Sequence, residues 1–382
     1  MRTSPLPEFQ AEATLTDTPF PPIEAALRDL AARRGLDLHE GHGRSIWCEL
    51  PVGEFGAKKR GEGTLLFARA HRAQDLAALQ SEIAALSAEA PAWSSGLDAG
   101  RFPPNFSLAR VHSVTRIGES FVRLRLESEG LERLSHDDSI HFRLVLQPSG
   151  TSEPVWPSIG ENGQTQWPSG GQALHRPPYT TRAVDLAAGW VDTDIFLHEG
   201  GRITDWVLAA KAGERIGLAG PGGSGIPEAT RLFLAGDETA YPALARMIEA
   251  RPDARGHLWL LGKSADYPMP QAEGITTSHL PQDTPALLQA LRLIAATQGP
   301  FDDSFFWMAA ERGAVSQLRG LLLDELGIDS KATHLSAYWS DPHSPAERPA
   351  RRSGGRVSRP DQSANPSPRS AALATGDDRT GG

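Results

Sequence analysis

The apolar residues change their spacing near Pro227, and this change constrains the fold more than any other feature of the sequence. Before it, Ser120–Glu127 and Ile140–Leu146 largely alternate apolar and polar residues, a pattern typical of half-buried antiparallel strands. After it, Arg231–Ala235 and His257–Leu261 are continuous apolar runs, as expected for strands that are covered on both faces. We therefore predict an antiparallel β-barrel followed by a parallel α/β sheet.

Other segments fit the same division. Before Pro227, Asp194–His198 and Arg215–Leu218 are predicted strands, and the second leads into the turn Gly220–Gly223. After Pro227, helical spacing alternates with apolar strands, which is typical of a parallel sheet. The predicted elements there are helices at Tyr241–Ala250, around Leu287–Ala295 and through Val315, Leu318, Leu322 and Leu326, with strands at Ser304–Ala310 and Thr333–Trp339.

The N-terminal part has a third pattern. One apolar helical stripe, Ile23, Leu27, Leu30 and Ala31, is followed by Gly35, and a second consists of Leu76, Leu79, Ile83 and Leu86. Short strands are predicted at Arg44–Leu50 and Thr64–Ala68, so this part is a small α+β domain. The predicted division is an α+β domain at 1–95, the barrel at 105–226, the α/β domain at 227–340 and a tail at 341–382.

The composition excludes several classes of function. The formal net charge is −9, which argues against binding to nucleic acid, where affinity comes mainly from neutralised phosphates. No apolar run approaches the roughly 18–20 residues of a membrane span, and the first residues lack the apolar core of a signal peptide. We expect a cytoplasmic protein. Because the tail has almost no large apolar residues, we expect it to be disordered.

Cysteine is almost absent, with Cys48 as the single example. One thiol cannot form a disulfide within the chain, nor can it hold an iron–sulfur cluster that needs four cysteine ligands. Any electron transfer therefore needs an organic cofactor or an external donor. His39 and His42 lie in what reads as a glycine-containing loop without a visible third ligand, so we expect no metal site there.

The segment Arg176–Arg182 (RPPYTTR) carries groups suited to a planar, phosphorylated cofactor. Tyr179 can stack on a flat ring, Thr180 can donate a hydrogen bond, and Arg182 can pair with a pyrophosphate. The same residues also fit a turn followed by an edge strand.

Two further segments place polar groups at the ends of predicted elements. In His198–Trp206, the glycines before Thr204 offer backbone N–H groups at a helix start, which is a natural anion site. A glycine turn with Thr204 capping the backbone is the alternative. In Ala235–Ala245, Asp237 and Thr239 are good N-cap residues, and they follow a parallel strand, where open α/β sheets bind ligands. The usual glycine fingerprint GxGxxG is missing there.

Taken together, these segments resemble the siderophore-interacting protein family, flavin-dependent relatives of ferredoxin reductases. Members of that family carry an arginine-x-tyrosine-threonine-x-arginine motif, a histidine-glycine…glycine-x-x-serine motif, and then GPGG and GDETA-LPA. The matching stretches in this chain are Tyr179–Arg182, His198 with Gly201–Thr204, Gly220–Gly223, Gly236–Ala243, Trp307–Glu311 and Tyr338–Trp339. Residues 10–90 resemble a small domain of unknown function that is sometimes fused to these reductases.

The resemblance implies FAD in the barrel, with Tyr179 on the isoalloxazine ring and Thr180 at its reactive edge as the catalytic residue. NAD(P)H would approach from the GDETA side, with an external ferredoxin as the alternative donor. The substrate would be a ferric siderophore or another ferric chelate, released as Fe(II), with Arg143 beside it. The implied cofactor-binding residues are Arg176, Tyr179, Thr180, Arg182, His198, Gly201, Ile203, Thr204, Asp237 and Thr239. The implied fold is ferredoxin-reductase-like.

Three positions depart from the family pattern. Arg176 precedes Tyr179 by three residues rather than two, Thr204 replaces a serine, and Ser340 stands where arginine is common. The change at Ser340 keeps open a flavin reductase with another acceptor, such as a quinone, free flavin or a protein. The displaced arginine keeps open a non-catalytic protein that binds iron chelates.

Overall fold

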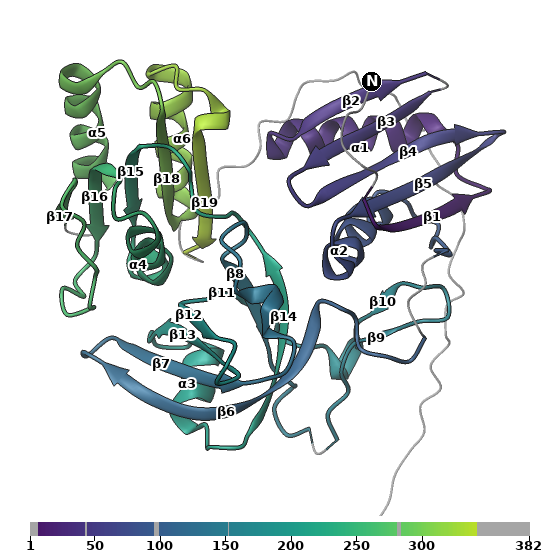
Figure 1. Ribbon diagram of the computed structural model, residues 1–382, viewed down its shortest axis with the longest axis horizontal. Coiled ribbons are helices and arrows are strands. Elements are labelled where there is room, and N and C mark those ends of the chain that lie inside the picture. Colours follow the sequence, from purple (N-terminus) through teal and green to yellow (C-terminus); the bar gives the residue numbers. More distant parts are fainter. Residues whose placement is uncertain (1–6, 43, 95–98, 152, 281–283, 342–382) are drawn as a thin grey trace, which may run out of the picture. The chain divides into compact units, whose positions relative to one another are not determined.

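The computed structural model describes residues 7–42, 44–94, 99–151, 153–280 and 284–341 of the 382-residue chain (Figure 1). Apart from Asp341, the predicted tail lies outside the described residues. No helix within these ranges is both long and apolar enough to cross a membrane.

The N-terminal region is an antiparallel sheet with the strand order β1-β5-β4-β3-β2, and its helices pack on one face over a single apolar core. Its elements are β1 (Phe9–Leu15), α1 (Phe20–Arg34), β2 (Asp37–Gly41), β3 (Ser45–Leu50), β4 (Gly53–Arg60), β5 (Gly63–Ala70) and α2 (Ala73–Ala84). Both predicted helices are confirmed, and α1 ends at Gly35, whose φ of 64° is left-handed.

One N-terminal prediction is wrong. His39 and Glu40 lie in strand β2, not in a loop, and the His39 ring stacks on Trp47 with centroids 5.5 Å apart. Glycine and charged residues in this region hid β2 and β4 from the apolar pattern. Across the described residues, no group of three or more histidine, cysteine, aspartate or glutamate side chains is arranged to hold a metal ion.

The middle region is one antiparallel sheet with the order β11-β8-β14-β6-β7-β13-β12. Its elements are β6 (Phe106–Ile117), β7 (Phe121–Glu127), β8 (His141–Val145), β11 (Pro178–Thr180), β12 (Ala183–Asp185), β13 (Trp190–Phe196), α3 (Arg202–Ala209) and β14 (Arg215–Gly222). Strands β9 (Ser158–Ile159) and β10 (Thr165–Gln166) form a separate two-stranded sheet. Only Thr181 and Arg182 separate the two edge strands, so the sheet must curve back on itself as a barrel. Val122, Leu124 and Leu126 of β7 are buried and alternate with less buried residues, as predicted. Strand β8 is buried on both faces except at Arg143, so the predicted half-buried alternation is wrong there.

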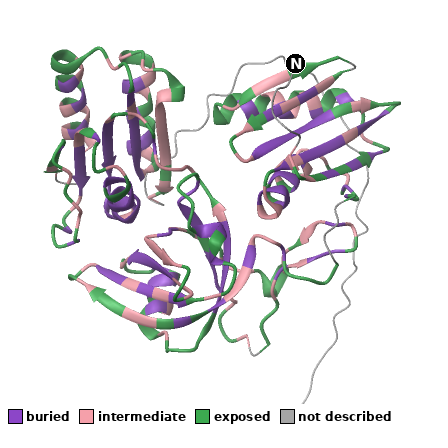
Figure 2. Cartoon of the chain, in the orientation of Figure 1, coloured by how far each residue is buried: buried purple, intermediate pink, exposed green. Residues whose placement is uncertain are grey.

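The last region is a parallel sheet with the order β17-β16-β15-β18-β19. Its elements are β15 (Arg231–Gly236), α4 (Tyr241–Ala250), β16 (Arg255–Leu261), β17 (Ile275–Leu280), α5 (Thr284–Gln298), β18 (Ser304–Glu311), α6 (Arg312–Arg319) and β19 (Thr333–Trp339). Separate apolar clusters cover the two faces, one with α4 and one with α5 and α6, and Figure 2 shows the central strands buried. The helix predicted through Leu326 ends at Arg319 and continues as a π-helical turn, Gly320–Glu325.

This strand order fixes where a ligand can bind. The chain leaves β15 toward β16 and β17 and later returns to the other side of β15 with β18. Open parallel sheets bind ligands at such a switch point, outside the carboxyl ends of the strands. The residues that follow β15 are Asp237–Thr239, and the barrel residues Phe121 and Ile140 share an apolar cluster with α4. The barrel and the parallel sheet therefore meet near this edge.

Candidate functional site

Strand β11 places the predicted flavin residues on the barrel. Tyr179 lies opposite Phe142 and Thr180 lies opposite His141 in the antiparallel pairing with β8. The Tyr179 ring is half-buried against the barrel core, and this burial raises the pKa of its hydroxyl. Thr180 is buried, while Tyr179 keeps part of its surface exposed.

Two arginines lie beside this strand. The Arg176 guanidinium stacks 4.2 Å from the centroid of the Trp167 ring, and Arg143 Nη1 donates a 2.7 Å hydrogen bond to the Arg176 carbonyl. Partial burial, and secondarily the charge of Arg143, lowers the pKa of Arg176. The extra residue before Tyr179 therefore leaves an arginine next to the strand, within a patch of positive charge.

The turn before α3 is a compact loop whose backbone N–H groups could bind an anion. Gly201 is the N-cap residue of α3 and no side chain caps this helix end, so its first N–H groups lack intrahelical partners. His198 N donates to Thr204 Oγ1 at 3.3 Å, and Ile203 is buried in the barrel core. A Cβ atom on Gly201 would lie 2.6 Å from His198 Cε1 and 2.8 Å from Thr204 Oγ1, so only glycine fits without a shift.

A cavity of about 410 Å³ opens beside this turn. Arg202 and Trp206, one helical turn apart on α3, line it, and Arg202 Nη2 donates a 2.6 Å hydrogen bond to the Gln147 carbonyl. Its volume is within the range of about 300–1,000 Å³ that is usual for small-molecule sites. Sequence reasoning missed both α3 residues, although their four-residue spacing after Gly201 was a readable signal.

The carboxyl edge of the parallel sheet is occupied by Asp237, Thr239 and Trp339. Asp237 Oδ1 accepts hydrogen bonds from Thr239 N at 3.1 Å and Thr239 Oγ1 at 2.5 Å, so Asp237 is an N-cap residue as predicted, of the 3-10 turn Glu238–Ala240. Thr239 lies inside that turn, and α4 begins without a side-chain cap. Asp237 Oδ2 accepts a 2.8 Å bond from Trp339 Nε1, while the indole is 40% exposed. Burial raises the pKa of Asp237. Asp237 thus holds the indole of Trp339 at this edge.

A polar cluster joins this edge to the barrel. His141 Nε2 lies 2.7 Å from the Tyr338 hydroxyl oxygen, and His334 Nε2 lies 3.4 Å from Ser224 Oγ. Burial lowers the pKa of both histidines to about 4, and for His141 the neighbouring His334 and Arg246 add to the effect. Sequence reasoning missed His141 because the alternation in β8 points it away from the barrel interior, where the parallel-sheet domain covers it.

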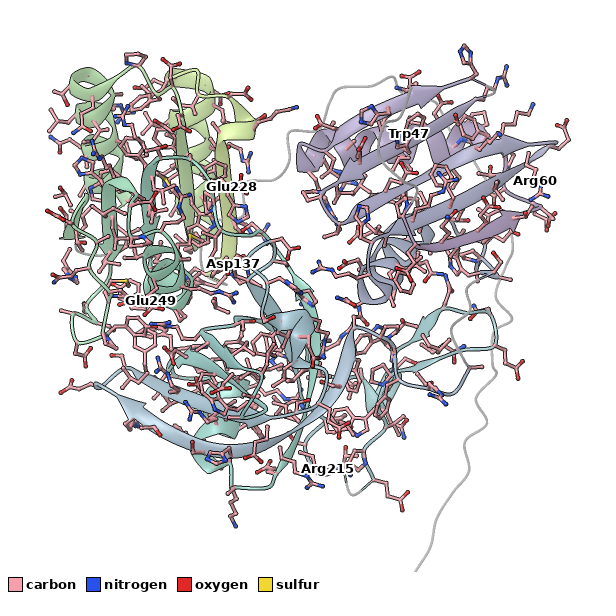
Figure 3. All side chains as sticks on the ribbon, viewed as in Figure 1. Trp47, Arg60, Asp137, Arg215, Glu228 and Glu249 are labelled. Atoms are coloured by element: carbon pink, nitrogen blue, oxygen red, sulfur yellow. The ribbon has the colours of Figure 1, made fainter. Side chains whose placement is uncertain are left out.

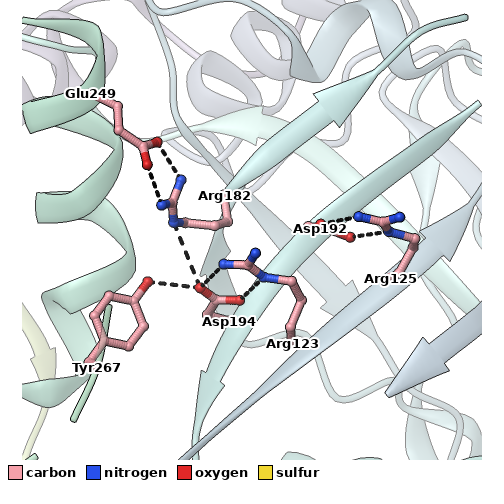
Figure 4. A network of polar contacts seen from close by, with 7 residues as sticks. All are labelled: Arg123, Arg125, Arg182, Asp192, Asp194, Glu249 and Tyr267. Atoms are coloured by element: carbon pink, nitrogen blue, oxygen red, sulfur yellow. Dashed lines mark hydrogen bonds and ion pairs between the residues drawn. The ribbon is translucent and has the colours of Figure 1, made fainter. Parts of the chain in front are cut away.

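Arg182 points to the same boundary. Its Nη1 and Nη2 atoms each lie 2.6 Å from an oxygen of Glu249, and its Nε lies 3.7 Å from Asp194 Oδ2 (Figure 4). The guanidinium thus already has a carboxylate partner. Phosphate binding by Arg182 stays a prediction, and it would require this ion pair to open.

The arrangement fits a flavin dinucleotide. Tyr179 offers a flat surface, the uncapped turn at Gly201 offers anion-binding N–H groups, and the cavity beside Arg202 offers room for a nucleoside.

Comparison with known proteins agrees with this geometry. Residues 110–225 match the family described as siderophore-interacting FAD-binding domain, and residues 229–342 match the siderophore-interacting protein family. Neither match extends over residues 1–109.

Relatives and solved structures point the same way. An NADPH-dependent ferric-chelate reductase from Escherichia coli (strain K12) is 28% identical over 238 residues, covering 59% of this chain and 89% of the relative. Ferric vibriobactin reductase ViuB from Vibrio cholerae is 27% identical over 236 residues, covering 58% and 85%. A siderophore utilization protein from T. fusca has a TM-score of 0.54 at 27% identity, covering 65% and 97%. SipS from Aeromonas hydrophila, at 24% identity and a TM-score of 0.53 over 64% and 95%, shares the fold.

Proposed function

Because this chain belongs, through residues 110–225 and 229–342, to the siderophore-interacting protein family, we propose that it is an FAD-dependent reductase of ferric siderophores or other ferric chelates. NAD(P)H is the proposed electron donor. The curated relative from Escherichia coli is NADPH-dependent, which favours NADPH.

One chain of contacts carries the proposal. Thr180 lies opposite His141, and His141 bonds to Tyr338 at 2.7 Å. The next residue, Trp339, bonds to Asp237 at 2.8 Å. The strand predicted to support the flavin therefore lies close to the edge predicted to receive the nicotinamide, and direct hydride transfer needs the two rings close together.

Different residues would hold different parts of the cofactor. Tyr179 would support the ring system, with Thr180 fixing the backbone at its edge. The first turn of α3, from Gly201 to Thr204, and Arg176 would hold the phosphates, and the cavity beside Arg202 would take the adenosine. When bound, FAD supplies the conversion between a two-electron donor and a one-electron acceptor.

Two arginines are candidates for contact with the substrate. Arg143 is exposed on β8, and Arg312 Nε donates a 2.8 Å hydrogen bond to Ser340 Oγ. A guanidinium therefore stands beside position 340 even though the family arginine is missing from it. An anionic ferric chelate fits these groups better than a neutral quinone does. This observation favours the ferric acceptor over the other acceptors that Ser340 keeps open.

Two finer points are part of the proposal. An external ferredoxin is the alternative electron donor, and it would be recognised if reduced ferredoxin, but not NADPH, bleaches the flavin. The cytoplasm is the proposed location, supported by a sequence whose one cysteine, Cys48, is buried and free.

A spectroscopic cycle tests the function. Purified protein is loaded with FAD without oxygen, mixed with NADPH, and then mixed with ferric citrate or a ferric catecholate in the presence of a ferrous-specific chromophore. We expect the flavin bands to bleach with NADPH and return with the chelate, as Fe(II) appears. Bleached protein that only a quinone or free flavin reoxidises would contradict the ferric acceptor. Protein that binds chelate but no FAD would support the non-catalytic alternative.

A further inference from the structure

Arg182, two residues after the predicted catalytic Thr180, is tied to the parallel-sheet side of the molecule. Its two terminal nitrogens form a bidentate pair with Glu249 of α4, with both distances at 2.6 Å. The Arg182 side chain is only 9% exposed. Bidentate arginine–carboxylate pairs fix orientation as well as distance, so this contact defines the angle between the strand end and the helix.

Asp194 adds a second contact across the same boundary. Its carboxylate is fully buried and accepts hydrogen bonds from Arg123 Nε and Nη2 at 2.7 and 2.8 Å. Asp194 Oδ2 also accepts a 2.8 Å bond from the hydroxyl of Tyr267, which follows β16. Figure 4 shows Arg182, Asp194 and Tyr267 converging from the two sides. The barrel strand β13 is therefore fixed to the loop after β16.

Arg246 of α4 makes the reciprocal contact. Its Nη1 donates to the Thr181 carbonyl at 2.7 Å, and its Nη2 donates to the His136 carbonyl at 2.9 Å and to Asp137 Oδ1 at 3.1 Å. Asp137 of the barrel segment and Glu249 of α4 are both labelled in Figure 3. Helix α4 thus holds two consecutive residues of the barrel. The Thr181 carbonyl accepts a hydrogen bond from Arg246, and the Arg182 guanidinium pairs with Glu249.

The other end of the same helical segment carries the nicotinamide edge. Asp237 caps the turn that leads into α4, and it also holds Trp339. A helix is a rigid element with a rise of about 1.5 Å per residue. Fixing its last turn to Thr181–Arg182 therefore also fixes the height of Asp237 relative to Tyr179.

We propose that Arg182 is a positioning residue: together with Glu249 it sets the distance between the nicotinamide edge and the flavin strand, rather than binding the flavin phosphates. This inference rests on the proposed function. In the step concerned, the C4–H bond of the dihydronicotinamide breaks and the hydrogen leaves with its electron pair to the flavin. The nicotinamide is oxidised and the flavin is reduced, so no other reactant is needed. Such transfers require reacting atoms about 3–3.5 Å apart.

The experiment compares two bidentate ion pairs. Arg182–Glu249 joins the barrel to α4 through both terminal nitrogens of the arginine. Arg292–Glu325 lies within the parallel-sheet region and pairs through Nε and Nη2, at 2.7 Å for both bonds. Glu249→Gln and Glu325→Gln each remove one carboxylate charge, from side chains that are 46% and 49% exposed. Arg182→Lys keeps the charge but loses the bidentate geometry.

Three quantities are measured for each protein. They are the FAD dissociation constant, the limiting rate of flavin bleaching at saturating NADPH, and the long-wavelength charge-transfer absorbance of nicotinamide stacked on flavin. For Glu249→Gln and Arg182→Lys we expect the limiting rate to fall by about tenfold or more, since a misplacement of about 1 Å costs on the order of 100-fold. The charge-transfer band should weaken and the FAD dissociation constant should stay within about threefold, a change of less than about 0.7 kcal/mol. Glu325→Gln should change none of the three.

The opposite result is equally clear. If Arg182→Lys weakens FAD binding by about tenfold or more while the limiting rate of the FAD-saturated protein is unchanged, Arg182 is a phosphate ligand and the proposal is wrong. An unchanged limiting rate in Glu249→Gln also overturns the proposal. Because this variant leaves Arg182 unchanged, it still tests the proposal if Arg182→Lys fails to fold. If NADPH cannot bleach the unmodified protein, the proposed electron donor is wrong. This result is seen without any variant, so it is distinguishable from a failure of the positioning role of Arg182.

Discussion

The turn at the start of α3 and the boundary between the barrel and the parallel sheet satisfy their polar groups in opposite ways. At the turn, Gly201 has no side chain to cap the helix, and the first N–H groups of α3 lack intrahelical partners. At the boundary, Arg182, Asp194 and Asp237 all bond to other residues of the chain. The turn offers N–H groups without intrahelical partners to an anion, whereas the charged side chains of the boundary are already paired within the chain. Thr181 Oγ1 and Arg182 Nε are buried atoms of the boundary that lack a hydrogen bond.

This difference separates two kinds of contribution. Groups that lack a protein partner gain from a ligand that supplies one, so they contribute to affinity. Groups that are already paired gain little from a ligand and instead hold the surrounding elements in one arrangement.

The largest effect is expected at the boundary. Asp194→Ala removes a fully buried carboxylate and leaves Arg123 and Tyr267 without their partner. Removing one member of a buried ion pair typically costs about 3–5 kcal/mol. Urea unfolding measures the change, with Glu325→Ala as the control, because its exposed pair with Arg292 should contribute at most about 1 kcal/mol. Equal, small effects of the two variants would mean that the boundary is not a structural unit.

A smaller effect is expected at the turn. In Gly201→Ala the new Cβ atom would meet the His198 ring and Thr204 Oγ1 at less than 3 Å. The exposed His198 ring can move aside, but Thr204 and the N–H groups beside it must shift. We expect a cost at the low end of overpacking, about 1 kcal/mol, and FAD binding that is weaker by about 5-fold. Gly171→Ala is the control, since a Cβ there meets nothing within 4 Å. FAD affinity is measured by titration, followed by flavin fluorescence. Unchanged affinity in Gly201→Ala would show that the turn is not part of the cofactor site.

The effect that is smallest over one pH unit near neutral pH is a pH dependence at the boundary. His141 and His334 have native pKa values of about 4, below the value of 6.5 in an unfolded chain. Between pH 6.5 and 4 the unfolded state therefore binds more protons, so the stability should fall as the pH falls through this range. Each histidine contributes up to about 1.4 kcal/mol per pH unit.

The matched variant for this prediction is His141→Gln, which keeps a polar side chain opposite Tyr338 but does not titrate. Urea unfolding at several pH values should give a shallower pH dependence for this variant, while His334 still titrates beside Ser224 and Arg246 stays close by. Identical slopes for both proteins would show that His141 is not buried in its neutral form.

The sequence predicted local structure better than contacts between regions. Helix α4 has the predicted bounds because its apolar spacing reflects the burial of most of its residues. Strand β19 also has the predicted bounds, although it is an edge strand without a fully buried residue. Strand β17, ITTSHL, was missed because only its first and last residues are apolar. The burial of His141 and the pairing of Arg182 with Glu249 come from the meeting of two domains. No spacing rule reports such a contact, because its partners are 67 residues apart in the chain.

The measurement that tests this account most directly is a pair of titrations and rates on two variants. Gly201→Ala and Glu249→Gln are each compared with the unmodified protein for FAD affinity and for the limiting rate of flavin reduction by NADPH. The account predicts a crossed result: Gly201→Ala weakens FAD binding with little change in the limiting rate, and Glu249→Gln slows reduction with little change in FAD binding. If both variants change both quantities together, the turn and the boundary do not divide binding from positioning, and the central claim is wrong.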